Sequence, residues 1–331
     1  MANCLICDTT YSPFIDFGEM PIANAFATKE EIKNEYTFPM KVGFCENCNM
    51  VQLVEQPDRE QMFHENYAFF SSTSSYMQDH FKKFANSVSE LQGLNKNSFV
   101  VEVGCNDGIM LQNFMSNNIP CLGIEPSENV AKVAMTKGIE VITEFFDQTL
   151  AENILELHQK ADAILSANVM CHIPYIHSIY SGVKILLKED GVFIFEDPYL
   201  GEIIEKTSFD QIYDEHVFLF SALSVNSLAN MHDLELINVE PQITHGGSMR
   251  YTLAHKGIKI VSKNVLKLID QEKKLELDQE KSYLGFTDSV NRIKDDLIEL
   301  LIKLKDDGKK VVAYGATSKS TTVTNYFGIT P

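Results

Sequence analysis

The stretch SFVVEVGCNDG (residues 98–108) predicts a buried β-strand that breaks into a glycine-rich turn. GIMLQNFMSN (108–117) is then typical of a helix, and PCLGIEPS (120–127) of a second strand that ends at an acid. The alternation continues through ADAILSANV (161–169), HSIYSGVKILLKEDG (177–191) and GVFIFEDPYL (191–200). Strands and helices that alternate in this way indicate the α/β fold class, with a doubly wound sheet of the Rossmann type.

The glycine-rich turn also indicates a cofactor site, because ligands of such sheets bind beyond the carboxyl ends of the strands. The spacing is not G-x-G-x-x-G, and the turn has no lysine for phosphates, so a dinucleotide is disfavoured. Glu125, about twenty residues on, could accept hydrogen bonds from both ribose hydroxyls. These features favour S-adenosylmethionine, and a turn without any ligand is the alternative. The predicted cofactor-binding residues are Glu102, Gly104, Asn106, Asp107, Gly108, Glu125 and Asn168.

Four of the seven cysteines form two C-x-x-C pairs, Cys4 with Cys7 and Cys45 with Cys48. Two such pairs complete a closed tetrahedral zinc site, which leaves no open position for catalysis. Four unrelated buried thiols are the alternative. The pairs therefore predict one structural zinc ion.

Composition excludes several classes of protein. The formal charge is −18, with 28 Lys and Arg against 46 Asp and Glu, so nucleic acid is not an expected partner. Neither an export signal nor an apolar run long enough for a membrane span is present in the sequence, so we expect a cytoplasmic protein without a membrane partner. The oligomeric state is not specified by any of these features.

We expect three domains. Residues 1–57 would form the zinc-binding domain, and residues 58–258 the cofactor-binding domain with helices predicted over 59–70 and 75–92. Residues 259–331 would hold charged helices and then KKVVAYGATSKSTTVTNYFG (309–328), which again predicts strand, glycine turn and helix. Because the sequence stops at Pro331, this last α/β domain is expected to be incomplete.

Two further stretches carry candidate chemistry. FDQIYDEHVFLFS (209–221) places Tyr213, Glu215 and His216 within four residues, and a carboxylate beside an imidazole can orient a general base. ITHGGSMRYTLA (243–254) offers donors for an anionic substrate group. The alternatives are a buried core histidine in the first stretch and a plain hairpin in the second.

Taken together, the ordered motifs resemble three-domain, S-adenosylmethionine-dependent C-methyltransferases that act on nucleotide-linked keto-deoxysugars. The resemblance runs along essentially the whole chain, through the motifs CxxC, CxxC, ENYAFFSSTSS, VEVGCNDG, GIEPS, SANVMCHIP, EDPYL, YDEHVFLFS, HGGSMR and YGATSKSTTVTNYFG.

The resemblance implies that His216 is the base that makes an enolate, with Glu215 orienting it and Tyr213 beside the sugar. It further implies catalytic positions at His172 and Tyr67. The predicted substrate-binding residues are His245, Ser248, Arg250 and Lys319. Two other functions remain open at this point: methyl transfer to nitrogen or oxygen of a surface-glycan sugar, and a ligand-binding remnant without turnover.

Overall fold

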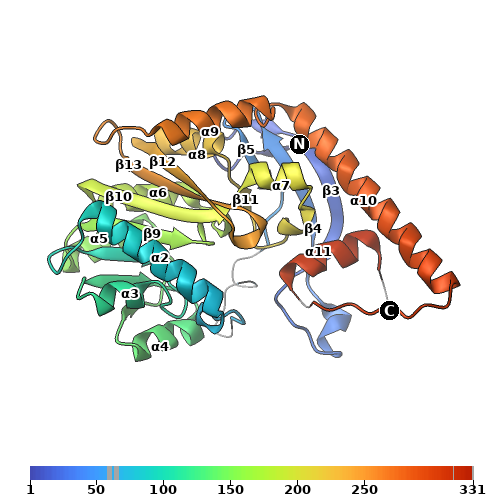
Figure 1. The fold of residues 1–331 in the computed structure, drawn as a ribbon, viewed down its shortest axis with the longest axis horizontal. Helices are drawn as coiled ribbons and strands as arrows, with labels where there is room; N and C mark the ends of the chain where they lie inside the picture. The colour runs from blue at the N-terminus through green and yellow to red at the C-terminus, as the bar shows by residue number, and fades with distance from the viewer. Residues whose placement is uncertain (58–61, 63–66, 316, 330–331) are drawn as a thin grey trace.

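The computed structural model describes residues 1–57, 62, 67–315 and 317–329. Its main element is a seven-stranded sheet with the order β12-β13-β10-β9-β6-β7-β8 (Figure 1). The first five of these strands along the chain run parallel, whereas β13 is antiparallel to both β10 and β12. The bounds are β6 (Val100–Val103), β7 (Cys121–Ile124), β8 (Glu140–Ile142), β9 (Ala161–Ala167), β10 (Leu187–Pro198), β12 (Leu234–Gln242) and β13 (Ser248–His255).

The predicted doubly wound sheet is confirmed, and its strand order locates the ligand edge. The chain proceeds from β6 outward to β7 and β8, then returns to β9 on the other side of β6. The order therefore reverses between β6 and β9, and a ligand is expected beyond their carboxyl ends. The glycine turn after β6 lies at this edge.

Helices cover both faces of the sheet because neighbouring strand residues point in opposite directions. Val100 belongs to the same buried cluster as Phe84 and Phe114, whereas Val101 belongs to a second cluster with Tyr180 and Leu228. The first face is covered by α2 (Ser75–Gln92), α3 (Leu111–Ser116) and α4 (Glu128–Thr136). The second face is covered by α5 (Gln148–Leu157), α6 (Ile176–Leu186), α8 (Ala222–Met231) and α9 (Lys263–Lys274).

The N-terminal residues build a second, antiparallel sheet with the order β11-β5-β4-β3. It consists of β3 (Pro13–Pro21), β4 (Thr37–Cys45), β5 (Met50–Leu53) and β11 (Phe218–Leu219), and a small ribbon of β1 (Ala2–Asn3) and β2 (Thr10–Tyr11) precedes it. A short 3-10 helix, η1 (Glu31–Asn34), lies between β3 and β4. Because β11 follows directly after the YDEH residues 213–216, this sheet anchors them.

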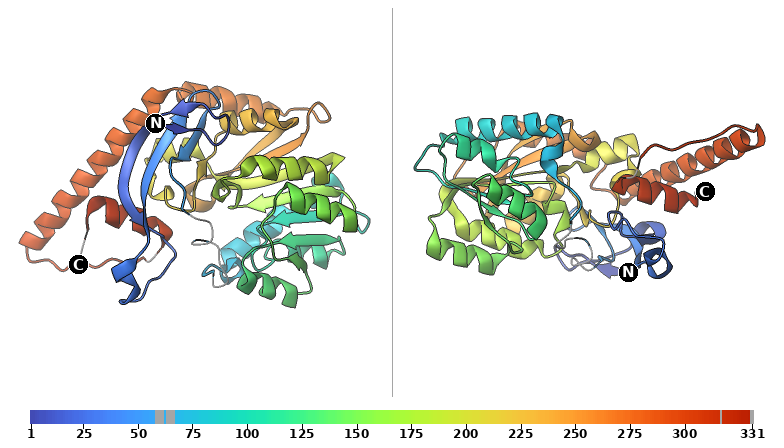
Figure 2. Two further views of the ribbon diagram at one scale, coloured as in Figure 1. Left: turned by 180° about the vertical axis from the view of Figure 1, so that it is seen from behind. Right: turned by 90° about the horizontal axis from the view of Figure 1, so that it is seen from below.

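The C-terminal helices pack on the N-terminal sheet, and two views show them beside the strands of the chain's beginning (Figure 2). They are α10 (Glu280–Asp306) and α11 (Ser318–Phe327). Tyr283, Phe286 and Phe327 share one buried cluster with Ile15 and Phe44. The two ends of the chain therefore form one core.

The strand predicted over 309–314 is wrong, because residues 309–315 are irregular and exposed. Val312 is 78% exposed, and no strand in the described ranges runs alongside to satisfy the backbone hydrogen bonds. The helix predicted after it is confirmed as α11.

The helix predicted over 75–92 is confirmed as α2, which begins where the Ser74 side chain accepts from the Met77 backbone and ends at left-handed Gly93. The helix predicted over 59–70 lies mostly outside the described residues, and 67–70 are irregular. The boundaries at 57/58 and 258/259 stay predictions. Among the described residues, the helices include none of the length and apolarity that crossing a membrane requires.

Candidate functional site

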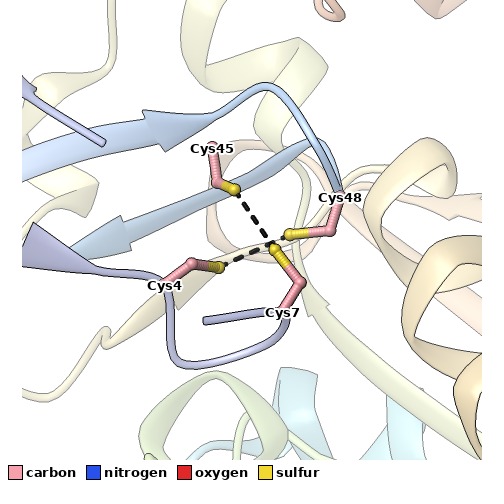
Figure 3. Close-up of side chains that lie close together, drawn as sticks. All are labelled: Cys4, Cys7, Cys45 and Cys48. Carbon is pink, nitrogen blue, oxygen red and sulfur yellow. Dashed lines mark hydrogen bonds between the residues drawn. The ribbon is translucent and has the colours of Figure 1, made fainter. Parts of the chain in front are cut away.

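The four paired cysteines converge on one point (Figure 3). Cys4 and Cys7 lie in the turn between β1 and β2, whereas Cys45 ends β4 and Cys48 lies in the turn between β4 and β5. The sulfur atoms of Cys4 and Cys48 are 3.5 Å apart, as are those of Cys7 and Cys45. A tetrahedral zinc ion with Zn–S bonds of about 2.3 Å needs sulfur atoms roughly 3.8 Å apart. The arrangement therefore fits one zinc ion with four thiolate ligands.

Hydrogen-bond donors next to the cysteine cluster also stabilise the thiolate form of Cys4. The Ile6 backbone N–H and the Gln52 side-chain amide both donate to the sulfur of Cys4, at 3.3 and 3.0 Å. Gln52 is fully buried, and its oxygen in turn accepts from the Leu5 backbone at 3.0 Å. Such outer contacts hold a ligand in place and stabilise its negative charge.

A cavity of about 490 Å³ opens at the carboxyl edge of β6 and β9. It is bordered on one side by the glycine turn and on the other by the YDEH loop. The predicted site residues that line it are Tyr67, Gly104, Asn106, Glu125, Asn168, His172, Tyr213, Glu215, His216, His245 and Lys319.

Glu125, directly after β7, lines this cavity. Its two carboxylate oxygens accept from the backbone N–H groups of Asn106 and Ser127, each at 2.9 Å. Burial raises its pKa, and these donors counteract the rise. Since each oxygen can accept more than one hydrogen bond, the carboxylate can still receive ribose hydroxyls.

Asn168 and Gly104 shape the same edge. Asn168 follows β9 in the left-handed region, at φ 56°, and its buried Oδ1 has no hydrogen-bond partner among the described residues. An unsatisfied buried acceptor that lines a cavity is suited to a ligand donor. Gly104 also has positive φ, 73°, and an added Cβ would overlap the side chain of Val169. These residues fit S-adenosylmethionine.

Three predicted cofactor residues do not line the cavity in the described structure: Glu102, Asp107 and Gly108. Glu102 is buried, and burial beside Glu125 and Asp107 raises its pKa well above the usual range. At Gly108 an added Cβ would meet Ile139 and Ala134, so the glycine there permits close packing of the turn on its neighbours.

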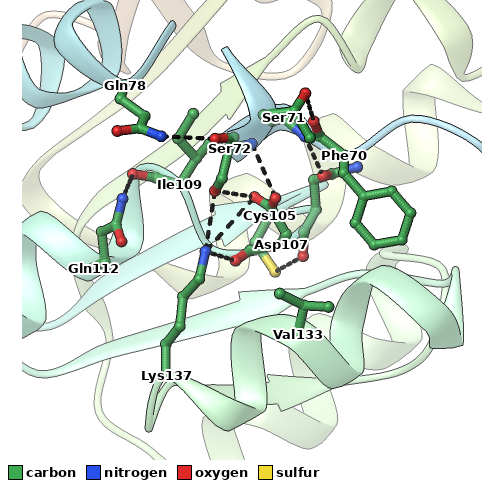
Figure 4. Close-up of polar contacts among 12 residues, drawn as sticks. Phe70, Ser71, Ser72, Gln78, Cys105, Asp107, Ile109, Gln112, Val133 and Lys137 are labelled. Carbon is green, nitrogen blue, oxygen red and sulfur yellow. Dashed lines mark hydrogen bonds and ion pairs between the residues drawn. The ribbon is translucent and has the colours of Figure 1, made fainter. Parts of the chain in front are cut away.

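Asp107 instead fastens residues 71–72 over the turn (Figure 4). Its carboxylate accepts from the backbone N–H of Ser72 at 2.9 Å and from the Ser72 hydroxyl at 2.8 Å. Lys137 donates to the Ser72 hydroxyl and to the Asp107 carbonyl, and Asn106 accepts from the Ser71 backbone. This network holds Ser71, which lines the cavity, against the glycine turn.

The YDEH residues meet the second side of the cavity in an irregular segment between η4 (Phe209–Gln211) and β11. The rings of Tyr213 and His216 lie 4.1 Å apart between centroids, and those of His172 and His216 lie 5.3 Å apart. His172 belongs to η3 (Met170–His172), directly after β9. The predicted catalytic residues therefore gather from separate elements.

Burial sets the protonation of this cluster. It lowers the pKa of His216 well below the usual value, with His172 adding to the effect, and lowers that of His172 to about 3. It raises the pKa of Glu215 to about 7, helped by Asp214, and that of Tyr213 well above 10. Near neutral pH both imidazoles are neutral and the phenol keeps its proton.

The Nδ1 atom of His216 lies 2.6 Å from the carbonyl oxygen of Gln211. A carbonyl only accepts, so Nδ1 carries the proton and donates. In this tautomer Nε2 has no proton and therefore carries a lone pair. His216 can therefore take up a proton at Nε2.

Two predicted substrate residues lie away from the cavity. Arg250 is buried, donates from Nε and Nη2 to the carboxylate of Glu196 at 3.1 and 2.8 Å, and covers the ring of Phe84. The Ser248 hydroxyl donates to the carbonyl of Thr244 at 3.1 Å. His245, in η5 (Thr244–Gly246), lies on the wall of the cavity.

Sequence reasoning missed Asn24 and Ser318, which also line the cavity. Asn24 follows β3 of the N-terminal sheet, and Ser318 begins α11. Neither belongs to a motif with recognisable spacing, so only the packing of distant segments brings them to the site.

Known proteins similar to this chain agree with these findings. Family models match in three parts: "Putative zinc binding domain" at residues 4–63, "Methyltransferase domain" at 74–239 and "C-methyltransferase C-terminal domain" at 243–331. The C-methyltransferase NovU of Streptomyces niveus is 30% identical over 320 residues, which are 96% of this chain and 76% of NovU.

Among solved structures, an S-adenosylmethionine-dependent methyltransferase from Clostridium acetobutylicum has a TM-score of 0.43 at 12% identity, covering 56% of this chain and 94% of that one. Magnesium protoporphyrin IX methyltransferase from Synechocystis PCC 6803 has a TM-score of 0.42 at 13% identity, covering 54% and 79%. The relationship to NovU and the three family matches carry the assignment. This chain belongs to the S-adenosylmethionine-dependent C-methyltransferases that join a zinc-binding domain, a methyltransferase domain and a C-methyltransferase C-terminal domain.

Proposed function

We propose that this enzyme methylates a carbon next to the ketone of a keto-deoxysugar carried on a nucleotide. The observation that carries the proposal is that the wall of one cavity holds both the cofactor edge at Glu125 and a neutral imidazole at His216. A methyl acceptor bound between them would meet a base and a methyl donor together.

His216 is the proposed base. Its Nδ1 donates to the Gln211 carbonyl, which keeps Nε2 available for the proton on the carbon beside the ketone. Removal of that proton would leave an enolate, whose carbon would form the new carbon–carbon bond to the methyl group while the bond between that methyl group and the sulfonium sulfur breaks. Glu215, on the same wall, stabilises the imidazolium that His216 becomes.

Tyr213 is the proposed donor to the enolate oxygen. Its ring contacts that of His216, and burial keeps its hydroxyl protonated because the pKa lies well above 10. A fixed donor aimed at developing negative charge stabilises the transition state more than the ground state. Tyr67 and His172, on the same wall, complete the proposed sugar site.

Glu125 and Asn168 are proposed to hold the cofactor, through its ribose hydroxyls and through a donor that reaches Asn168 Oδ1. S-adenosylmethionine bound here supplies an electrophilic methyl group, which needs no activation by the protein. The enzyme's own task is therefore to make the enolate and to align its carbon.

Lys319, on the cavity wall, favours a nucleotide as part of the substrate. It is the one lysine among the described lining residues, and Ser318 and Thr317 lie beside it at the start of α11. A lysine with neighbouring hydroxyls is suited to the phosphates of a nucleotide-sugar. Methyl transfer to nitrogen or oxygen is less favoured, because the matched C-terminal domain and NovU are both described as C-methyltransferases.

The test is incubation with S-adenosylmethionine carrying a ¹³C-labelled methyl group and a panel of nucleotide-linked keto-deoxysugars. We expect a product whose ¹³C-methyl couples to a sugar carbon in NMR spectra. A methyl located on oxygen or nitrogen would refute the proposed reaction while leaving the methyltransferase assignment intact.

A further inference from the structure

We propose that Asn24, from the zinc-bearing N-terminal sheet, is a positioning residue for the carboxylate of Glu215. The inference rests on the proposed function for the role of Glu215, whereas the contact itself is independent of it. Asn24 Nδ2 lies 2.6 Å from Glu215 Oε1, although 191 positions separate the two residues. Both side chains line the cavity.

The hydrogen-bond partners fix which way the Asn24 amide faces. Ser318 Oγ lies 3.0 Å from Asn24 Oδ1, so the hydroxyl donates to the amide oxygen. The hydroxyl could pair with either end of the amide, but the ionised carboxylate of Glu215 can only accept, so the end of the amide toward Glu215 must be the NH₂ group. Asn24 thus joins α11 on one side to Glu215 on the other.

The residue before Asn24 contacts the neighbouring acid. The Ala23 backbone N–H donates to Asp214 Oδ1 at 3.1 Å. Two adjacent buried carboxylates, Asp214 and Glu215, therefore each have their own donor from the same short loop after β3. Without these donors, both acids would be buried beside each other with less compensation for their charge.

A donor to Glu215 favours its ionised form, which is the form that can stabilise a protonated His216. Burial and Asp214 act in the opposite direction and bring the pKa of Glu215 to about 7, so the balance falls near neutral pH. The titratable and charged groups around this carboxylate are Asp214, Tyr67, Tyr213 and Cys171, with His172, His216, His245 and Lys319 on the shared cavity wall. Asn24 is the neutral donor that the N-terminal sheet adds to this set.

The experiment measures the titration of Glu215 directly, in the full chain, with ¹³C-labelled glutamate side-chain carboxyls followed by NMR. The Glu215→Gln variant assigns the resonance by its disappearance. Asn24→Ala should raise the pKa of Glu215 by about one pH unit, because an ionised acceptor loses its donor. Asn24→Asp should raise it further, because it adds a like charge.

Two more variants sharpen the test. Ser318→Ala leaves Asn24 in place but frees its amide, so a smaller rise in the same direction is expected even if the Asn24 variants fold poorly. Asn34→Ala is the matched control, because Asn34 is an exposed asparagine in η1 of the same N-terminal domain. A Glu215 titration that is the same in Asn24→Ala, Ser318→Ala and wild type would overturn the inference.

Turnover supplies an independent readout. The acidic limb of the kcat profile should move to higher pH in Asn24→Ala, with the affinity for S-adenosylmethionine unchanged. A wild-type enzyme without turnover on keto-sugars would refute the proposed function only, because the NMR titration needs no substrate. A shifted titration with an unmoved kcat profile would overturn the positioning role.

Discussion

Replacing Glu125 with glutamine tests the cofactor site with the least disturbance of the fold. Alanine would leave the buried N–H groups of Asn106 and Ser127 without an acceptor, at about 1–3 kcal/mol of unfolding free energy each. Glutamine keeps one oxygen, so one of these two bonds survives. The Gln variant should therefore fold with only a modest loss of stability.

Its affinity for S-adenosylmethionine should fall much more. A hydrogen bond to a charged acceptor contributes about 1.5–3 kcal/mol, and the amide can accept at one atom where the carboxylate accepted at two. The loss of one ribose contact corresponds to a dissociation constant raised roughly 10- to 100-fold.

Isothermal titration calorimetry measures this change, and thermal denaturation checks folding. Glu128→Gln is the control, because Glu128 is a nearby acid on α4 that is exposed and pairs with Lys132 at 3.0 Å. Equal dissociation constants for Glu125→Gln, Glu128→Gln and wild type would refute the ribose contact at Glu125.

Three further predictions address stability. Cys45→Ser should lower the zinc content, measured by elemental analysis, and should lower the free energy of unfolding by several kcal/mol. A wild-type protein that is stable without metal would contradict the predicted zinc site. Arg250→Met should destabilise by about 3–5 kcal/mol, because the buried carboxylate of Glu196 loses its guanidinium partner and keeps its contacts with His80 and Thr244. A variant of normal melting temperature with only a raised KM would instead support the predicted substrate role. Burial raises the pKa of Glu272 from 4.5 to about 7, so the folded state holds a proton that the unfolded state has released in this interval. Wild type should therefore lose unfolding free energy relative to Glu272→Gln as pH rises from about 4.5 to about 7, and parallel denaturant curves across that interval would rule this out.

The parallel sheet and the zinc site could be predicted because their signals are local. A buried strand with a glycine turn, as in residues 98–108, and a doubled C-x-x-C need no knowledge of distant contacts. The strand predicted over 309–314 failed for the complementary reason: a strand depends on a neighbour, which its own residues do not specify.

The candidate site was only partly predictable. Glu125 and His216 stand in recognisable motifs and both reach the cavity. Asp107 also stands in a motif, but its carboxylate accepts hydrogen bonds from Ser72, which lies 35 positions away in the sequence, and does not line the cavity. Asn24 stands in no motif, and only the packing of the N-terminal sheet on the YDEH loop brings it to Glu215.

The most direct test of the central claim, that His216 removes a carbon-bound proton, is hydrogen exchange in heavy water. NMR of the keto-sugar should show deuterium entering the carbon beside the ketone with wild-type enzyme, and neither exchange nor methylation with His216→Ala. His172→Ala, which leaves the proposed base in place, should retain measurable exchange. A His216→Ala variant that exchanges and methylates at the wild-type rate would contradict the account.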